Sequence, residues 1–349
     1  MKKIIRIGII GCGKNTRDKH VRLLQKIKGV ELRKVCNRSE ESSRRAAADF
    51  GIARWTTDWR EVVEDPEIDA VVIGTWPDMH ERLTVAALNH GKHVLCEARM
   101  ARDSREALNM LEAHRRNPHL VAQIVPAPFT LAFDESIQKL IEEGYLGQLL
   151  TVEARYQFAH FHDAEKPMSF RENGQISGCN TLVMGIIYES LARWIGHASA
   201  VIARGRTFSQ FKSWEGRNLA VEVPEHLDII ADMFCGAQAS LHFSTVAGFS
   251  EDHEEFWLHG SQGTIHLNLK TAVLRAGRRG DKEMQVIEPI KTPRSEWRVE
   301  EEFCAAIRGE GKVELTTFEE AYRYMEFSEA VLRSMRQGRL VQLPLRFDV

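Results

Sequence analysis

A glycine-containing loop near the start of the chain constrains the fold more than any other feature. The loop Gly11-Cys12-Gly13-Lys14-Asn15-Thr16 directly follows an apolar run at residues 4–10 and precedes a longer amphipathic stretch. In a strand–turn–helix unit, glycines permit the tight turn, and backbone N–H groups at the helix N-terminus can bind a pyrophosphate. Thr16 stands where the usual G-x-G-x-x-G pattern has its third glycine. We therefore predict a dinucleotide-binding turn, with a purely structural turn as the alternative. Its candidate cofactor-binding residues are Gly11, Gly13, Lys14 and Asn15.

The rest of the first third of the chain predicts a parallel sheet. Short apolar runs alternate there with longer amphipathic stretches, which is typical of parallel strands joined by crossover helices. The predicted strands are residues 4–10, 30–36, 70–74, 93–96 and 120–125, and the predicted helices are residues 20–27, 40–50, 79–89 and 104–115. Asp103 and Glu106 have capping-box spacing at the start of the last helix. We predict a Rossmann domain over residues 1–123.

The order of elements changes after about residue 125, where runs of alternating polarity dominate. The predicted strands are residues 150–158, 226–233, 237–246, 256–259 and 264–269, and the predicted helices are residues 133–143, 182–195, 300–307 and 318–335. Strands grouped in this way indicate an α+β domain with one large, mostly antiparallel open sheet, covered on one face by helices. We predict this domain over residues 124–349, and its last helices could return to the Rossmann domain.

Composition excludes several classes of protein. The 349 residues are 43% hydrophobic and 28% charged, which favours two globular domains. A near balance of 47 basic and 49 acidic residues, without a long basic run, argues against nucleic acid as a partner. No apolar stretch is long enough to cross a membrane, so that no membrane partner is expected. The six cysteines form no C-x-x-C pair, which argues against zinc or disulfides and favours a reducing cytoplasm.

The residues after the second predicted strand bear on the choice of dinucleotide. An NAD site normally places Asp or Glu here against the adenosine ribose, whereas this chain has Cys36-Asn37-Arg38-Ser39. The missing carboxylate removes repulsion toward a 2′-phosphate, with which Arg38 could pair. Asn37 can still hydrogen-bond a plain ribose. We therefore favour NADP over NAD as the cofactor, with NAD and a solvated Arg38 as the alternative.

Two further segments resemble signatures of the glucose-fructose oxidoreductase-like (Gfo/Idh/MocA) family of dehydrogenases. The segments are VIGTWPDMH at residues 72–80 and GKHVLCE at residues 91–97. The resemblance covers nearly the whole chain. It implies that Thr75, Trp76 and His80 lie beside the nicotinamide half of a cofactor and that Glu97 helps to hold the nicotinamide ribose. For His80, a core or capping role is the alternative.

The chain departs from this family at the positions that the resemblance implies are catalytic. The family pattern Glu-Lys-Pro reads Glu97-Ala98-Arg99 here, so that the lysine that contacts the reacting hydroxyl is missing. The family also carries Asp and, four residues later, His on one helix face, and the matching positions are Val183 and Ile187. Because alanine, valine and isoleucine cannot transfer a proton, a dehydrogenase built on this chain needs another group.

There are three candidates for that group, and two of them lie where the resemblance implies a substrate pocket. Arg171 and His160 belong to a polar loop between residues 158 and 178, and Tyr188 lies on the next predicted helix. Loops of this kind often carry function. For Tyr188, packing in the core is the alternative, because neighbouring helix positions project about 100° apart. His160-Phe161-His162 has no third ligand nearby, so that no metal site is expected.

These observations favour an NAD(P)-dependent oxidoreductase that transfers a hydride to or from a sugar, cyclitol or related hydroxyl compound. The second hypothesis is a cofactor-binding sensor or partner subunit without net turnover, which the three apolar positions favour. A third keeps the cofactor tightly bound and uses transient oxidation to drive elimination or glycoside cleavage. The expected partners are a small-molecule substrate and further copies of the chain, packed against the open sheet.

Overall fold

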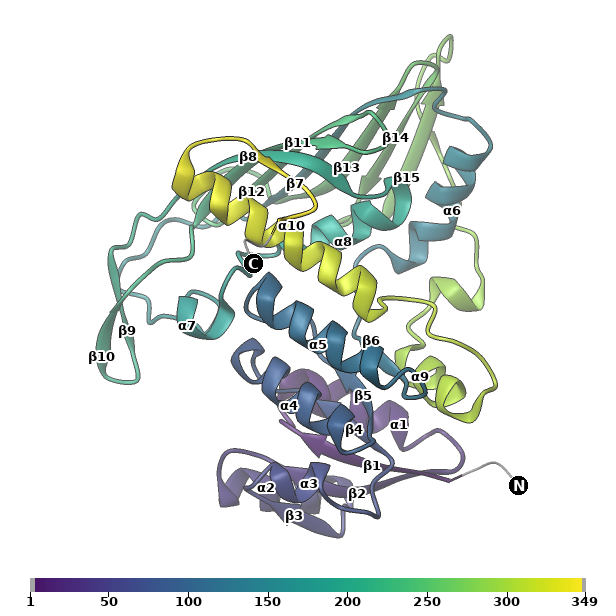
Figure 1. Ribbon diagram of the computed structural model, residues 1–349. Coiled ribbons are helices and arrows are strands. Elements are labelled where there is room, and N and C mark those ends of the chain that lie inside the picture. Colours follow the sequence, from purple (N-terminus) through teal and green to yellow (C-terminus); the bar gives the residue numbers. More distant parts are fainter. Residues whose placement is uncertain (1–3, 347–349) are drawn as a thin grey trace. The chain divides into compact units, whose positions relative to one another are not determined.

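The computed structural model describes residues 4–346, and the chain divides into two compact units (Figure 1). The first unit comprises Met1–Pro126 and Arg298–Tyr322, and the second comprises Ala127–Trp297 and Arg323–Val349. A late segment of the chain therefore belongs with the N-terminal part. The boundary at residue 123 stays a prediction. Residues 1–3 and 347–349, the ends of the two predicted domains, lie outside the described residues.

A six-stranded parallel sheet forms the centre of the first unit, in the order β3-β2-β1-β4-β5-β6. Its strands are β1 (Ile5–Ile10), β2 (Val30–Cys36), β3 (Arg54–Thr56), β4 (Ala70–Ile73), β5 (His93–Cys96) and β6 (Ala122–Ile124). The strands β1, β4 and β5 are buried almost throughout, as expected for a parallel sheet with helices on both faces. The strand order reverses where β1 pairs with β4, and ligands of such sheets bind at the carboxyl ends of the strands beside this point. The predicted Rossmann fold is confirmed.

The helices of the first unit begin where the sequence offers a cap or a turn. They are the π-helical turn η1 (Thr16–Val21), α1 (Arg22–Leu24), α2 (Glu40–Phe50), α3 (Arg60–Val63), α4 (Pro77–Asn89), α5 (Ser104–Arg116) and α9 (Val299–Arg308). Ser39 and Asp103 cap α2 and α5 by accepting a backbone N–H of the first turn. The first helical turn begins before the predicted residue 20, because the Arg17 N–H already donates to the Gly13 carbonyl oxygen at 2.9 Å. The elements β3 and α3 escape prediction because 3 or 4 residues carry no periodic signal.

A nine-stranded sheet dominates the second unit, in the order β16-β15-β14-β13-β7-β12-β11-β8-β17. Its strands are β7 (Leu149–Gln157), β8 (Ala198–Arg206), β11 (His226–Met233), β12 (Gln238–Ser244), β13 (His253–Gly260), β14 (Gly263–Asn268), β15 (Val273–Arg278), β16 (Gln285–Val286) and β17 (Val341–Gln342). Only the pair of β7 and β12 is parallel among these strands, which confirms the predicted, mostly antiparallel sheet. The prediction omits β8, whose alanines, serine and glycine have low strand propensity.

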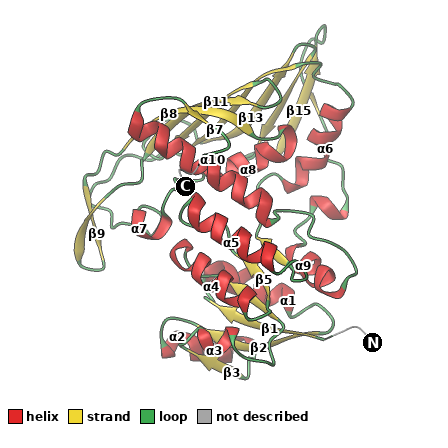
Figure 2. Ribbon diagram, viewed as in Figure 1, coloured by secondary structure: helices red, strands yellow, loops and turns green. Residues whose placement is uncertain are grey.

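The nine-stranded sheet has one covered face and one open face. In β11, Leu227, Ile229 and Ala231 are buried, and the residues between them, Asp228 and Ile230, are exposed. The helices of this unit are α6 (Leu131–Glu142), α7 (Gly174–Ser177), α8 (Met184–Ile195), the 3₁₀ turn η2 (Pro293–Ser295) and the end of α10 (Phe318–Gln337). Figure 2 shows α6, α8 and α10 on one side of the sheet, and ring contacts such as Trp194 to Phe256, at 4.9 Å, join helix to strand. A small hairpin, β9 (Phe211–Trp214) and β10 (Arg217–Ala220), projects beyond the sheet. Among residues 4–346, no helix combines the length and the apolar character needed to cross a membrane.

Candidate functional site

The glycine loop of the first unit forms a tight turn between β1 and the first helix. Gly11 has a φ of 85°, and a Cβ there would lie 2.5 Å from the Thr75 backbone nitrogen, so that only glycine fits. Gly13, Lys14 and Asn15 are exposed at the start of the helix, where free N–H groups can bind a pyrophosphate. The Lys14 ammonium pairs with Asp18 one turn further on, at 2.8 Å.

Thr16 replaces the third glycine of the usual pattern because the neighbouring strand end leaves room for it. Its side chain is buried and lies against Gly74, where a Cβ would come within 2.0 Å of the Thr16 hydroxyl oxygen. In the usual pattern, the third glycine permits close packing of helix and strand. Here Gly74 is the small residue at this contact, on the side of the strand, so that helix and strand still pack closely.

Glu97, directly after β5, forms the centre of a buried hydrogen-bond network. Its carboxylate accepts hydrogen bonds from the Asn15 amide and from Nε2 of His20, the latter at 2.9 Å. Nδ1 of His20 is hydrogen-bonded to Glu300 of α9, and the His20 side chain is fully buried. Burial disfavours the imidazolium, but the bonds to Glu300 and Glu97 outweigh it and raise the pKa of His20 to about 9. The network keeps Glu97 ionised: burial would raise its pKa, yet His20 and Asn15 lower it.

His80 connects the two segments that carry the family signatures. Its ring is fully buried, with Nδ1 3.0 Å from the Arg99 carbonyl oxygen and Nε2 3.1 Å from the Thr75 carbonyl oxygen. Burial lowers the pKa of His80, so that the ring is neutral and donates one N–H to one of these carbonyls at a time. This placement favours the core role for His80, which positions the loops after β4 and β5.

The adenosine end of the site contains Asn37 and Arg38. The Asn37 side chain accepts the Cys12 N–H at 2.7 Å and donates to the Ser42 carbonyl oxygen at 3.0 Å, so that it joins the glycine loop to α2. Arg38 is exposed, and its guanidinium lies 5.8 Å from the centre of the Trp76 ring. Within residues 4–346, no carboxylate forms an ion pair with Arg38, so that its charge is available to an anion.

The structure brings nearly all of the predicted cofactor-binding residues to one edge of the parallel sheet. Each follows the carboxyl end of a strand: Gly11, Gly13, Lys14 and Asn15 follow β1, Asn37 and Arg38 follow β2, Thr75 and Trp76 follow β4, and Glu97 follows β5. Only His80 lies beneath this edge. Sequence reasoning missed His20 and Glu300, because they are far apart in the chain and meet only through the fold.

The three predicted catalytic residues of the second unit have different surroundings. His160 is exposed and stacks on Phe158 at 5.8 Å, and Arg171 is exposed above the Phe170 ring at 4.4 Å. Tyr188 is 1% exposed, and its hydroxyl accepts the Ala198 N–H at 2.9 Å. Its ring stacks on Phe327 of α10, with centroids 3.6 Å apart. The structure therefore favours packing over catalysis for Tyr188.

The family's two helical catalytic positions carry no polar group here. Val183 immediately precedes α8, and Ile187 is 1% exposed within its first turn. Neither side chain can hold a proton or bind a metal ion. The structure therefore offers no acid–base pair at the start of α8.

A buried lysine that sequence reasoning missed anchors the polar loop at residues 158–178. Lys212 of β9 is 5% exposed, and its ammonium donates to Glu172 at 2.7 Å and to Glu225 at 3.3 Å. Burial disfavours the charge, but these carboxylates outweigh it and raise the pKa of Lys212. A lysine in a short alternating run looks like a surface residue, so that the sequence carries no signal for this role.

Comparisons with known proteins agree with this architecture. The family described as "Oxidoreductase family, NAD-binding Rossmann fold" (GFO_IDH_MocA) matches residues 5–123, and "GFO/IDH/MocA C-terminal domain" matches residues 135–266. The chain is similar to a levoglucosan dehydrogenase of Pseudarthrobacter phenanthrenivorans, 27% identical over 258 residues, which are 68% of this chain and 65% of that protein. It is also similar to an inositol 2-dehydrogenase of Rhodococcus jostii, 32% identical over 149 residues, which are 42% of this chain and 40% of that protein. The alignments thus span less than two thirds of these curated relatives.

Solved structures show the same fold. A levoglucosan dehydrogenase in complex with NADH and levoglucosan superposes with a TM-score of 0.85 at 22% identity, over 98% of this chain and 100% of that one. The WlbA dehydrogenase from Bordetella pertussis, in complex with NADH and UDP-GlcNAcA, superposes with a TM-score of 0.80 at 19% identity, over 99% and 100%. The glycine turn, the charged Glu97 at the sheet edge and both family matches lead to one conclusion: the chain belongs to the Gfo/Idh/MocA oxidoreductase family, with its NAD-binding Rossmann fold.

Proposed function

We propose that the chain is an NAD(P)-dependent oxidoreductase that acts on a sugar, cyclitol or related hydroxyl compound. The observation that carries this proposal is the edge of the parallel sheet, where a helix N-terminus free to bind a pyrophosphate lies beside the ionised Glu97. The bound dinucleotide would supply hydride transfer at nicotinamide C4. Relatives named levoglucosan dehydrogenase and inositol 2-dehydrogenase support the class of substrate.

The residues of the first unit have separate roles in this proposal. Backbone N–H groups of Gly13, Lys14 and Asn15 bind the pyrophosphate, and the Glu97 carboxylate accepts hydrogen bonds from the nicotinamide ribose hydroxyls. His20 does not touch the cofactor but holds Glu97 in place and in its charged form.

We propose NADP as the preferred cofactor. Arg38 is exposed and has no ion-pair partner among the described residues, and it directly follows Asn37, which occupies the position of the residue that contacts the adenosine ribose. The ribose position has an amide, Asn37, in place of the usual carboxylate, and the oxygen of that amide already accepts the Cys12 N–H. A 2′-phosphate would therefore meet a guanidinium without a competing carboxylate at residue 37.

The proton of the substrate hydroxyl needs an acceptor, because Ala98, Val183 and Ile187 cannot provide one. Of the two exposed candidates, His160 can accept a proton, whereas Arg171 stays charged and can only stabilise an alkoxide. We propose that His160, or a water molecule held by it, takes the proton and that Arg171 orients the substrate oxygen. Their loop is anchored by Lys212, which limits its movement.

A second candidate function is cofactor binding without net turnover, as a sensor or partner subunit. The same three apolar positions favour it, because they remove both of the family's proton-transfer elements. The two functions predict the same cofactor affinity and differ only in turnover.

The test is a titration of purified protein with NADPH and NADH, followed by nicotinamide fluorescence, in wild type and Arg38→Ala. We expect NADPH to bind more tightly than NADH and the variant to lose about tenfold for NADPH alone. Absorbance changes with a panel of polyols then separate the dehydrogenase from the sensor. If neither NADPH nor NADH binds, both functions are contradicted.

We further propose that copies of the chain pair through the open face of the nine-stranded sheet and work in a reducing cytoplasm. The open face is a broad surface of partly exposed residues, and within residues 4–346 no disulfide joins any of the six cysteines. Light scattering at several protein concentrations would reveal the pairing, and a monomeric mass at all of them would contradict it.

A further inference from the structure

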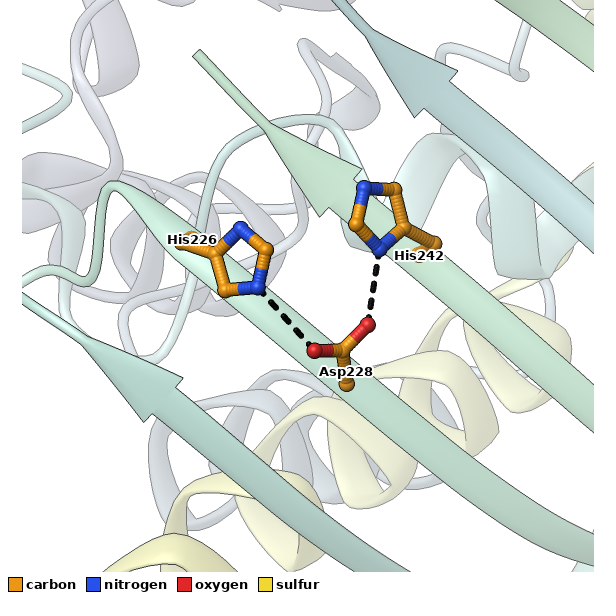
Figure 3. A group of neighbouring side chains, drawn as sticks. All are labelled: His226, Asp228 and His242. Carbon is orange, nitrogen blue, oxygen red and sulfur yellow. Dashed lines mark hydrogen bonds and ion pairs between the residues drawn. The ribbon is translucent and has the colours of Figure 1, made fainter. Parts of the chain in front are cut away.

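A compact group of possible metal ligands lies on the open face of the nine-stranded sheet: His226, Asp228 and His242 (Figure 3). His226 and Asp228 alternate along β11, so that both side chains project from the same face. His242 lies directly opposite Asp228 in the antiparallel pair of β11 and β12. The register of this pair therefore brings three ligand side chains together from two segments that are distant in sequence.

The distances within the group suit a single ion. The ligand atoms all lie within 4.8 Å of one another. Nε2 of His226 is 3.0 Å from Asp228 Oδ2, and Nδ1 of His242 is 2.7 Å from Asp228 Oδ1. In a tetrahedral site with bonds of about 2.0–2.2 Å, ligand atoms are about 3.3 Å apart. Small side-chain rotations would move the three ligand atoms from their present distances to the separation that a tetrahedral site requires.

A chain of hydrogen bonds determines which nitrogen of His242 carries the proton. The Ser250 hydroxyl donates to the Glu251 carbonyl oxygen at 2.9 Å and accepts from the Gln157 amide nitrogen at 2.5 Å. The Gln157 amide oxygen therefore faces His242 and accepts its Nε2–H at 3.1 Å.

A neutral His242 consequently has its lone pair on Nδ1, which points at the Asp228 carboxylate. Two electron pairs facing each other require a proton or a cation between them. A second hydrogen bond that orients a histidine in this way is typical of metal-binding histidines. His226 has a corresponding neighbour, because its Nδ1 lies 3.3 Å from the Ser244 hydroxyl.

The surroundings allow an ion to enter and limit its affinity. The Asp228 side chain is 55% exposed, and the two histidines are 34% and 23% exposed. Arg204 and Arg155 occupy the neighbouring positions on the adjoining strands, opposite Asp228 and His242. Their positive charges oppose a bound cation, so that we expect removal of either arginine to tighten binding.

We propose that His226, Asp228 and His242 bind one divalent transition-metal ion per chain, with zinc as the best match, and that solvent completes its coordination in a copy whose open face is not paired. Two imidazoles and a carboxylate are the mixed nitrogen and oxygen ligands that zinc accepts, whereas magnesium and calcium prefer oxygen alone. The ion joins β11 to β12 and so stabilises the second unit. The site shares no residue with those proposed to bind the dinucleotide.

The test is a calorimetric titration with zinc chloride of the full chain, without a histidine tag and after removal of metal by a chelator. The background variant Cys235→Ser removes the exposed thiol as a competing ligand. We expect one zinc per chain and a higher thermal midpoint with zinc, because an ion that binds only the folded chain stabilises it.

Substitutions identify the ligands. We expect His242→Ala to weaken zinc binding at least tenfold and to abolish the zinc-dependent rise in thermal midpoint. Should this variant fail to fold, Asp228→Asn, which keeps the shape of the aspartate side chain, is expected to have the same two effects. His259→Ala, on β13 of the same sheet and outside the group, is the matched control and should bind like the parent. Absence of a stoichiometric site in the parent, or equal binding in His242→Ala and Asp228→Asn, would overturn the proposal.

Discussion

Each unit contains a cluster of histidine and carboxylate side chains, and the two clusters differ in composition and burial. In the first unit one histidine, His20, lies between two carboxylates, Glu97 and Glu300, and all three side chains are at most 14% exposed. In the second unit one carboxylate, Asp228, lies between two histidines and is 55% exposed. The same residue types therefore make opposite arrangements.

The difference shows how composition and burial decide what a histidine can do. With two carboxylates in a buried site, His20 is a cation at neutral pH because its pKa is raised to about 9, and its role is to hold Glu97. With one shared, partly exposed carboxylate, His226 and His242 lie near solvent and can each offer a ring nitrogen to a metal ion. The first cluster positions a binding group, and the second is suited to bind an ion itself.

The largest effect expected from this comparison is the loss of His20. In His20→Ala, Glu97 and Glu300 would remain buried without their shared cation, which should lower the free energy of unfolding by about 3–5 kcal/mol. Urea unfolding followed by circular dichroism measures the change, with His114→Ala as a control at a histidine outside the cluster. A loss below about 1 kcal/mol would mean that the two carboxylates do not depend on His20.

The next effect concerns alkaline pH. Because the pKa of His20 is raised from 6.5 to about 9, its stabilisation is fully present below pH 6.5 and is lost as the pH rises through about 9. The free energy of unfolding should fall by up to about 3 kcal/mol across this window. Urea midpoints between about pH 6 and about pH 10 measure the loss, which should vanish in His20→Gln. An equal alkaline loss in that variant would assign it to other groups.

A smaller effect is expected from neutralising Glu97. Glu97→Gln keeps the shape of the side chain but gives the ribose a weaker hydrogen-bond acceptor, so that NADPH affinity should fall about tenfold. Fluorescence titration measures it, with Glu112→Gln on the exposed side of α5 as the control. An unchanged affinity would show that Glu97 does not contact the cofactor, whatever the state of His20.

The smallest effect belongs to the exposed cluster without metal. Asp228→Asn should change the free energy of unfolding by less than about 1 kcal/mol in a chelator, because exposed ion pairs contribute little. The pKa of Asp228 is lowered, since its bonds to His242 and His226 outweigh burial, so that this contribution is lost as the pH falls through its folded-state pKa. Urea unfolding at neutral pH and in acid tests both statements. A loss as large as that of His20→Ala would remove the contrast between the clusters.

Local pattern was sufficient to predict much of the first unit. The predicted strands at residues 30–36 and 93–96 coincide with β2 and β5, and the predicted helix at residues 40–50 coincides with α2. Such elements carry an alternating or continuous apolar run, a cap or a glycine end, all of which are local signals. In the second unit, residues 226–233 coincide with β11, whereas β8 and β15 escape prediction because small and basic residues interrupt their alternation.

The candidate site divides in the same way. The glycine turn, Arg38 and Glu97 could be predicted, because each directly follows a strand and the carboxyl ends of parallel strands share one edge. Tyr188 is one of the predicted candidates for proton transfer, but its hydroxyl accepts the Ala198 N–H in the core. The burial of Lys212 between Glu172 and Glu225 depends on contacts between distant segments, which composition cannot reveal.

The sequence by itself therefore determined the class of fold, the dinucleotide-binding edge and the loss of the family's usual proton-transfer residues. These properties depend on residue type and on spacing within a few residues of the chain. Only the tertiary structure decided that His20 joins Glu97 to Glu300, that Thr16 packs into the space left by Gly74, and that His226, Asp228 and His242 converge. Each of those contacts depends on strand register or on the return of a distant segment, and a side chain's pKa and ligand capacity follow from the neighbours that the fold provides.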